Sequence, residues 1–322
     1  MAAAQDHAKA QYEIGQAYRW GNGVSIDYTE AMRWYRMGAG LNDSSAQVGI
    51  GDLYQHGEGV PRDYAEAMRW YRMSAEQNDP DGQRSVGDLY LGGYGVAKDE
   101  SQALRWYRKA ADQGDAQAED DIGEAYTFGW GVRIDFVEAK KWYQKAADQD
   151  DPQSYAEIGY LYESGSGVPR DYAKALDLYR KSAEADSSLG QSYLGTLYLH
   201  GFGVEKNYTE ALRWLRLAAE ADSTLAEVNI GYMYSHGYGV KQDMRESARW
   251  LKKAADQGDE TGQWDLGWHY ACGLGVRQDL TLAQTLIRSA AAKGQQEAKD
   301  WLSGPQGRAK WPCDLLTRGR RG

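Results

Sequence analysis

Histidines that recur at one position of a repeated pattern are the first residues of this chain to consider for metal chemistry. His56, His200 and His236 each stand one residue before a glycine at which a helix is expected to end. Metal ligands must converge within a few ångströms, whereas equivalent side chains on packed helices lie roughly 8–10 Å apart. An imidazole near the C-terminal end of a helix is also stabilised by the helix dipole. We therefore predict a structural role for these histidines and no metal site, and His7 and His269 offer no better set of ligands.

Cysteines, glycine-rich turns and carboxylates are the other candidates for chemistry. Cys272 and Cys313 form neither a CxxC zinc pair nor a disulfide framework, and Cys272 has no recognisable His/Asn partner for a catalytic thiol. The G-x-G turns lack the third glycine or the Lys-Ser/Thr pair of a phosphate loop. Most aspartates stand at expected helix caps, and no isolated carboxylate pair resembles an acid/base dyad. The sequence predicts no catalytic residue, cofactor or metal, and so no enzyme.

Charge and hydropathy exclude further classes of function. The net charge is -10, and residues 304–322 contain five basic side chains against one acid, so the remainder of the chain is strongly acidic. An acidic body without a basic stripe argues against nucleic acid as a partner. No apolar run approaches the ~20 residues that span a bilayer, and the first residues do not resemble a signal peptide. We expect no membrane insertion and a cytoplasmic location, or a secreted or organellar one if a leader has been removed.

The elements that must position any site are set by an internal repeat of 36 residues. A tyrosine follows each repeated glycine three positions later, and a G-x-G-V turn comes next in every copy. The repeated glycines are Gly15, Gly51, Gly87, Gly123, Gly159, Gly195, Gly231 and Gly267. Eight copies in register, without an insertion, identify a repeat protein.

Each copy reads as two helices joined by a turn. In the second copy, Ile50 and Tyr54 fall on one face of a first helix, which Gly57 ends because glycine adopts the left-handed conformation without a steric penalty. Asp63 and Glu66 then form a capping box at the start of a second helix. Neither helix can bury its apolar stripe alone, so burial must come from stacking on neighbouring copies. Tryptophan occupies one slot of the second helix in six copies, with Leu178 and Leu286 in the other two, and is predicted to belong to the core. These tryptophans are Trp34, Trp70, Trp106, Trp142, Trp214 and Trp250.

The unit A-x-x-x-I/L-G-x-x-Y-x-x-G-x-G-V-x-x-D-x-x-x-A-x-x-W-Y-x-x-A-A closely resembles the Sel-1-like repeat, a relative of the tetratricopeptide repeat. The fourth copy carries it as Ala118, Ile122, Gly123, Tyr126, Gly129, Gly131, Val132, Asp135, Ala139, Trp142, Tyr143, Ala146 and Ala147. The resemblance implies a right-handed superhelix whose first helices line a concave groove. It also implies an adaptor in a multiprotein complex, as in endoplasmic-reticulum quality control, cell-wall synthesis or bacterial host interaction. One cysteine-rich branch is described as weakly hydrolysing β-lactams, but it carries cysteine pairs within its repeats, which this chain lacks.

The predicted fold is therefore an all-α, right-handed α-solenoid of eight 36-residue helix-turn-helix repeats plus a C-terminal half-repeat. Residues 1–7 form an N-terminal extension, and residues 8–303 form the solenoid, with repeats that start at 8, 44, 80, 116, 152, 188, 224 and 260 and a half-repeat from 296. Trp301 is expected to cap the last apolar face. Residues 304–322 form a basic tail that we expect to be disordered. The abrupt start at Ala8 suggests that the natural chain extends further toward its N-terminus.

Groove-lining residues can be assigned from the tetratricopeptide fold. There, five first-helix positions line the groove, three and six residues before the repeated glycine and one, four and five after it. In the first half of the chain these positions are mainly acidic, with Lys9, Arg19 and Arg84 as exceptions: Asp52, Asp81, Asp88, Asp120 and Glu124. In the second half they are mainly apolar: Tyr160, Leu189, Leu199, Leu225, Val228, Tyr232, Trp264 and Trp268. These variable residues are expected to face outward, and an exposed aromatic patch usually marks an interaction site. A second candidate surface is the middle residue of the turns, at Tyr94, Trp130, Phe202 and Tyr238.

We therefore predict a protein–protein interaction scaffold that binds a peptide or helical segment of a partner, basic at one end and apolar at the other. The alternative is a regulatory repeat module of a larger signalling or cell-wall enzyme. A weak hydrolase is the third possibility, which a hydrolysis screen with and without Cys272 would test. The chain is expected to be a monomer.

Overall fold

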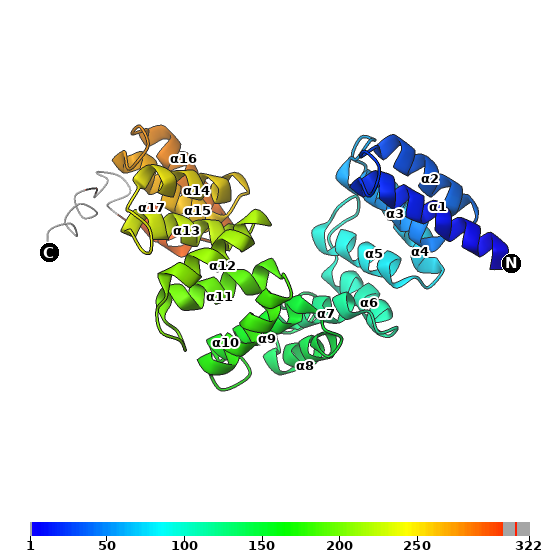
Figure 1. The fold of residues 1–322 in the computed structure, drawn as a ribbon, viewed down its shortest axis with the longest axis horizontal. Helices are drawn as coiled ribbons and strands as arrows, with labels where there is room; N and C mark the ends of the chain where they lie inside the picture. The colour runs from blue at the N-terminus through cyan, green and yellow to red at the C-terminus, as the bar shows by residue number, and fades with distance from the viewer. Residues whose placement is uncertain (1, 305–312, 314–322) are drawn as a thin grey trace. The chain divides into compact units, whose positions relative to one another are not determined.

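A computed structural model describes residues 2–304 and Cys313 (Figure 1). In this part of the chain helices follow one another in pairs, and no strand is present. We call the odd-numbered helices up to α15 first helices and the even-numbered ones second helices. The helices are α1 (Ala2–Trp20), α2 (Tyr28–Gly40), α3 (Ser44–His56), α4 (Tyr64–Glu76), α5 (Pro80–Gly92), α6 (Glu100–Ala111), α7 (Ala116–Phe128), α8 (Phe136–Ala147), α9 (Pro152–Ser164), α10 (Tyr172–Glu184), α11 (Ser188–His200), α12 (Tyr208–Glu220), α13 (Thr224–His236), α14 (Met244–Asp256), α15 (Glu260–Cys272), α16 (Leu280–Lys293) and α17 (Gln296–Ser303).

Helix ends follow the local chemistry predicted from the sequence. Helix α3 ends at Gly57, whose φ of 73° is left-handed and whose N–H donates to the carbonyl oxygen of Leu53. Helix α4 begins after Asp63, whose carboxylate accepts hydrogen bonds from the N–H groups of Ala65 and Glu66. These bonds satisfy backbone groups that a helix end otherwise leaves without partners. The same start and stop signals recur along the chain, which is why the helices from α2 to α16 are all 12 to 14 residues long.

Two compact units divide the chain, residues 1–154 with 166–168 and residues 155–165 with 169–322. Within the first unit each helix from α1 to α8 packs against the next. In addition, α1 contacts α3, and α3 contacts α5. The second unit repeats this arrangement from α10 to α17, with α11 on α13 and α13 on α15. Packing of consecutive helix pairs confirms the predicted all-α solenoid and its final half-repeat. At the other end, α1 begins at Ala2, so residues 2–7 of the predicted extension are helical and continuous with the first helix.

The fully buried slot of the second helix belongs to the residue after the tryptophan, and the tryptophan that was predicted for the core packs at the margin of it, as Trp106 does against the cluster of Tyr71 and Leu89. The six tryptophans are only half-buried, and cations cover their rings, with Lys109 Nζ 3.6 Å from the ring centre of Trp106. One residue turns a helix by about 100°, which moves the tryptophan to the edge of the buried stripe. Its amphipathic ring tolerates that position. The fully buried residues are Tyr35, Tyr71, Tyr107, Tyr143 and Tyr179, followed by Leu215 and Ile287 at less than 1 % exposure and Leu251 at 2 %.

The repeated glycine of each first helix lies directly against this buried residue. A Cβ added to Gly87 would lie 2.6 Å from Cε1 of Tyr107, and one added to Gly195 would lie 2.7 Å from Cγ of Leu215. Carbon atoms of different residues do not approach so closely, so any larger side chain would push the two helices of a repeat apart. The glycine is therefore required by close packing rather than by a turn.

The two cysteines are joined by a single disulfide, which the sequence, read only as lacking a disulfide framework, did not predict. Cys272, the last residue of α15, is bonded to Cys313, and α16 and α17 lie between them in sequence. Trp301 packs against the small cluster of Ile287 and Ala298, as expected of a cap. The prediction of disorder for the tail concerns residues that, apart from Gly304 and Cys313, lie outside those described.

Truncating Tyr107 should destabilise the fold more than truncating its neighbour Trp106. We expect Tyr107→Ala to cost about 3–5 kcal/mol, as for other buried aromatic residues, and Trp106→Ala clearly less, because that ring is half-exposed. Urea denaturation followed by circular dichroism measures both. Tyr107→Phe is the matched control and should cost about 1 kcal/mol for one lost hydrogen bond. Equal losses for the two alanine variants would contradict the assignment of the core slot.

Candidate functional site

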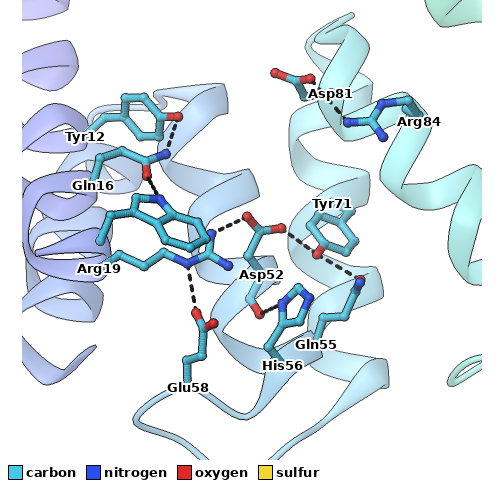
Figure 2. Close-up of polar contacts among 11 residues, drawn as sticks. Tyr12, Gln16, Arg19, Asp52, Gln55, His56, Glu58, Tyr71, Asp81 and Arg84 are labelled. Carbon is cyan, nitrogen blue, oxygen red and sulfur yellow. Dashed lines mark hydrogen bonds and ion pairs between the residues drawn. The ribbon is translucent and has the colours of Figure 1, made fainter. Parts of the chain in front are cut away.

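Arg19 organises a polar network on the first helices of the first unit (Figure 2). The guanidinium is buried, and its Nε donates to Glu58 Oε2 at 2.8 Å while Nη1 donates to Asp52 Oδ2 at 2.5 Å. Desolvation opposes its charge, but Asp52 and Glu58 outweigh that effect and raise the pKa of Arg19. This arginine was an exception in the predicted acidic groove. Its charge is balanced within the fold, so it holds α1 to α3 rather than facing a partner.

The predicted groove acids Asp52 and Asp88 accept hydrogen bonds from buried tyrosines. Tyr71 donates its hydroxyl to Asp52 Oδ1 at 2.8 Å, and Tyr107 donates to Asp88 Oδ1 at the same distance. In the next two repeats the partner stands three positions later on the same helix face: Thr127 contacts Tyr143 at 3.1 Å, and Glu163 accepts from Tyr179 at 2.6 Å. A buried hydroxyl needs such a partner, so these polar side chains serve the core.

Repeats six to eight lose this requirement because leucine or isoleucine replaces the buried tyrosine. Leu215, Leu251 and Ile287 carry no hydroxyl to satisfy. The position that holds Asp52 and Asp88 earlier then becomes Thr196, Tyr232 and Trp268. The acidic-to-apolar gradient of the predicted groove therefore follows, in part, the change in the core. Sequence reasoning missed this link, although the replacement of Trp-Tyr by Trp-Leu in the sixth and seventh repeats was its visible signal.

A group of carboxyls lies on α5 and α7 around one guanidinium. Burial raises the pKa of Asp88 and Glu124, and Arg84 is the cation that acts against this rise at Asp88. Asp120 is buried and accepts hydrogen bonds from Ser154 Oγ at 2.5 Å and from Gln153 Nε2 at 3.2 Å. Asp120 thus binds the start of α9, and it does not face outward as predicted.

The next residue, Asp121, was not among the predicted groove positions, yet it is the most perturbed acid of this group. Its Oδ2 is buried and accepts no hydrogen bond from the described residues. Burial, with Asp88 adding to the effect, raises the pKa of Asp121 to about 8. Burial likewise raises the pKa of Asp120 to about 7. This face of the first unit therefore holds carboxyls that would gain from additional positive charge.

An aromatic surface occupies the first helices of the second unit. Tyr160 is 40% exposed, and its ring lies 5.9 Å from that of Tyr193. Tyr232 is 36% exposed, and its ring lies 4.1 Å from His236 and 6.4 Å from His200. The structure thus brings two of the repeated histidines to a predicted groove residue. We call Tyr160, Tyr232 and these two histidines the aromatic first-helix face.

Several predicted apolar groove residues are packed inside the second unit. Leu199 is only 2% exposed and belongs to the core around Leu215, so the expectation that it faces outward is wrong. Leu189 is half-buried against the core shared by its own repeat and the preceding one, Val228 is half-buried against the core of its own and the following repeat, and Leu225 is half-buried as well. These side chains fill the space between neighbouring helices, which the single-helix pattern does not reveal.

The two groove tryptophans near the C-terminus pack onto the half-repeat. Trp264 contacts the cluster formed by Ile287 and Ala298, and its ring lies 5.5 Å from that of Trp268. Trp268 in turn lies 6.2 Å from Trp301 of α17. Both rings are half-buried. The half-repeat therefore covers part of the surface that was assigned to a partner.

Turn aromatics pack on the preceding repeat. Tyr94 stacks on Tyr64 with ring centres 5.0 Å apart. Phe202 stacks on Tyr172 at 5.5 Å, and Tyr238 stacks on Tyr208 at 4.9 Å. Trp130 instead stacks on Phe128 of its own repeat. Local packing accounts for these side chains.

Two of the three repeated histidines bond to the backbone of their own helices. Nδ1 of His56 lies 2.9 Å from the carbonyl oxygen of Asp52, and Nδ1 of His236 lies 3.0 Å from that of Tyr232. A carbonyl only accepts, so Nδ1 carries the proton in both. Among the described residues, no group of three His, Cys, Asp or Glu side chains is placed to hold a metal ion. None of the helices in the described part of the chain combines the length and the apolarity that a membrane span requires.

A model of the Sel1 repeat matches eight consecutive segments, residues 8–43, 44–79, 80–115, 116–151, 152–187, 188–223, 224–259 and 261–295. The chain belongs to the Sel1 repeat family. Sel1 repeat proteins are typically non-catalytic scaffolds, and they generally mediate interactions between proteins. The family agrees with the resemblance found in the sequence.

Solved structures of other Sel1 repeat proteins share this architecture. A protective antigen of uropathogenic Escherichia coli strains, with the SLR fold, is 33% identical over 98% of this chain and 69% of its own, with a TM-score of 0.57. A Sel1 repeat protein from Oxalobacter formigenes is 33% identical over 79% of this chain and 99% of its own, with a TM-score of 0.64. Yeast Tom70, at 12% identity and a TM-score of 0.52 over 98% of this chain and 65% of its own, shares the fold alone. No protein with a curated description matches the chain.

The stability of the first unit should fall as pH rises through neutrality. The pKa of Asp121 is raised in the fold to about 8 from an ordinary 3.8, so the fold favours the protonated carboxyl. That contribution is complete below the ordinary value and is lost as pH rises through about 8. We expect a higher urea midpoint at pH 5 than at pH 9.

Asp121→Asn should remove much of this difference, since the amide stays neutral throughout. Asp177→Asn, at an exposed aspartate, is the control and should leave the pH profile unchanged. An Asp121→Asn profile as steep as that of the unsubstituted protein would contradict the assignment.

Proposed function

We propose that this Sel1 repeat protein is a scaffold whose first-helix faces bind a segment of a partner polypeptide. The observation that carries the proposal is the exposure of Tyr160 and Tyr232. Both stand at one position of the repeat, on α9 and α13, where earlier repeats hold a polar residue. Neither tyrosine fills a core slot, and large exposed aromatic side chains are typical anchors of protein interfaces.

The chemistry of the partner differs between the two units. On the first unit, the carboxyls of Asp88 and Asp121 are held near one guanidinium, that of Arg84, and Glu124 lies close enough to Asp88 for that carboxylate to raise its pKa. A lysine or arginine side chain placed there would stabilise the ionised carboxyls. On the second unit, the aromatic first-helix face favours apolar or aromatic side chains. The partner segment is therefore basic where it meets the first unit and apolar where it meets the second.

Photocrosslinking distinguishes this surface from others on the chain. We expect p-benzoylphenylalanine at Tyr160 or Tyr232 to capture the partner in cells, because both side chains lie within the proposed contact. Tyr94 is the matched control, since it is an exposed tyrosine at a turn that stacks on Tyr64 of the preceding repeat and is not part of the aromatic first-helix face. Tyr232→Ala should weaken recovery of the same partner at least tenfold, with an unchanged circular dichroism spectrum. Adducts at position 94 alone, or at none of the three positions, would sink the proposal.

The disulfide supports a location different from the cytoplasm expected from composition. Disulfides persist in oxidising compartments and are rare in the cytosol, so we propose that the chain works outside a reducing environment. In that setting Cys272 has no free thiolate, which removes the nucleophile considered for a hydrolase.

Reduction should loosen the C-terminal end of the second unit. We expect Cys313→Ser to cost about 2–4 kcal/mol, as for other disulfides, with faster hydrogen exchange in α16 and α17. Dithiothreitol should lower the stability of the unsubstituted protein and leave the stability of the Cys313→Ser variant unchanged. Alkylation of the protein in intact cells before lysis, read by mass spectrometry, reports the compartment: free thiols at both cysteines would exclude an oxidising one.

A further inference from the structure

Charge is sorted between the two helices of the repeat. The eight first helices contain 14 Asp and Glu against 3 Lys and Arg. The eight second helices contain 11 Asp and Glu against 21 Lys and Arg. In a chain whose net charge is -10, the second helices thus form a basic face. The proposed function makes no use of that face.

Tryptophan rings on this face are covered by cations of the chain itself. Nζ of Lys109 lies 3.6 Å from the ring centre of Trp106, and Nζ of Lys145 lies 3.7 Å from that of Trp142. The guanidinium of Arg213 lies 4.0 Å from the ring centre of Trp214. Ring faces that already hold a cation are not free to stack on nucleobases, which single-strand binding requires. The basic face therefore suits an acidic polypeptide better than a nucleic acid.

Two pockets open on the second helices of the first two repeats. The heptapeptide A-M-R-W-Y-R-M occurs at residues 31–37 and again at residues 67–73. At the first copy, a pocket of about 550 Å³ is lined by Met32 and Met37 of α2 and by Val60 of the turn between α3 and α4. At the second copy, a pocket of about 340 Å³ is lined by Met68 and Met73 of α4. The pockets thus stand one repeat apart.

The outer methionine of each pocket is exposed to solvent, at 40% for Met37 and 39% for Met73. Methionine is flexible and polarisable, so it adapts to different apolar side chains at binding surfaces. Each pocket can therefore accept an apolar anchor from a partner.

An arginine without an acidic partner lies beside each pocket. Arg33 pairs with Glu30, and Arg69 pairs with Glu66, so these charges are balanced. Arg36 lines the first pocket and forms no ion pair with the described residues. Arg72 lines the second and donates to the neutral hydroxyl of Tyr90 at 2.6 Å. A carboxylate delivered next to either apolar pocket would meet an unbalanced guanidinium.

We propose that the faces of α2 and α4 dock an acidic segment of a partner polypeptide, which inserts one apolar side chain into each methionine pocket. Helices α2 and α4 both pack on α3, so their pockets lie at least one packed-helix spacing apart, about 8–10 Å. Residues seven apart on a helix are separated by about 10 Å, so an acidic helix with apolar residues at that interval or a longer one can reach both pockets. The site is separate from the first-helix faces, so it stands or falls independently of the proposed function.

Binding of designed peptides to the full chain tests the site. The probe is a fluorescein-labelled helical peptide with leucines seven positions apart and glutamates on the same face, and its counterpart carries lysines in place of the glutamates. We expect the glutamate peptide to bind, measured by fluorescence anisotropy, and the lysine peptide to bind at least tenfold more weakly. The double substitution Met37→Glu and Met73→Glu should weaken binding of the glutamate peptide at least tenfold.

Leu217→Glu is the matched control, because Leu217 occupies the same helix position in the sixth repeat and is 39% exposed. It should change the affinity less than twofold, which separates the pockets from the general charge of the basic face. Tyr232→Ala should leave peptide binding unchanged, so failure of the first-helix proposal is recognised separately. Equal binding of the two peptides, equal effects of the pocket and control variants, or displacement by single-stranded DNA would each overturn the proposal.

Discussion

Contact between a glycine of the first helix and the buried residue of the second helix is the constraint on which the rest of the structure depends. At Gly87 the ring of Tyr107 lies where a Cβ would be, and at Gly195 the side chain of Leu215 takes that place. The contact sets the spacing of the two helices in a repeat. Repeated every 36 residues, it lets consecutive repeats stack in the same way. The helix caps and turns place this contact, but close packing selects the glycine.

The choice of buried residue then determines the chemistry of the first-helix face. A buried tyrosine brings a hydroxyl into the core, and the first helix must supply an acceptor, as Asp52 does for Tyr71. Leucine and isoleucine make no such demand, so Tyr232 can face solvent in the seventh repeat. A surface that looks designed for a partner is thus shaped partly by the core beneath it. The exposed aromatic residues, rather than the bonded carboxylates, carry the proposed recognition.

Prediction from the sequence succeeded where one residue type has one physical consequence. The turn glycines, the aspartate caps and the 36-residue period led directly to the helix pairs and the all-α solenoid. It failed where neighbouring residues compete for one space. Trp106 and Tyr107 are both large and aromatic, and only the packed partner helix shows that Tyr107 fills the core. Leu199 was wrongly expected to face outward, because its burial depends on contacts with α12, which the pattern of its own helix does not show.

The sequence by itself determined the repeat, the helices, the caps and the Sel1 repeat family, because these depend on residues close together in the chain. Tertiary structure alone decided which polar side chains are consumed by the core, as with Asp120 and Ser154, and which aromatic side chains remain available. It also decided the pairing of Cys272 with Cys313, which stand 41 residues apart without any pattern to relate them. Such contacts join atoms distant in sequence, so only the packing of the helices specifies them.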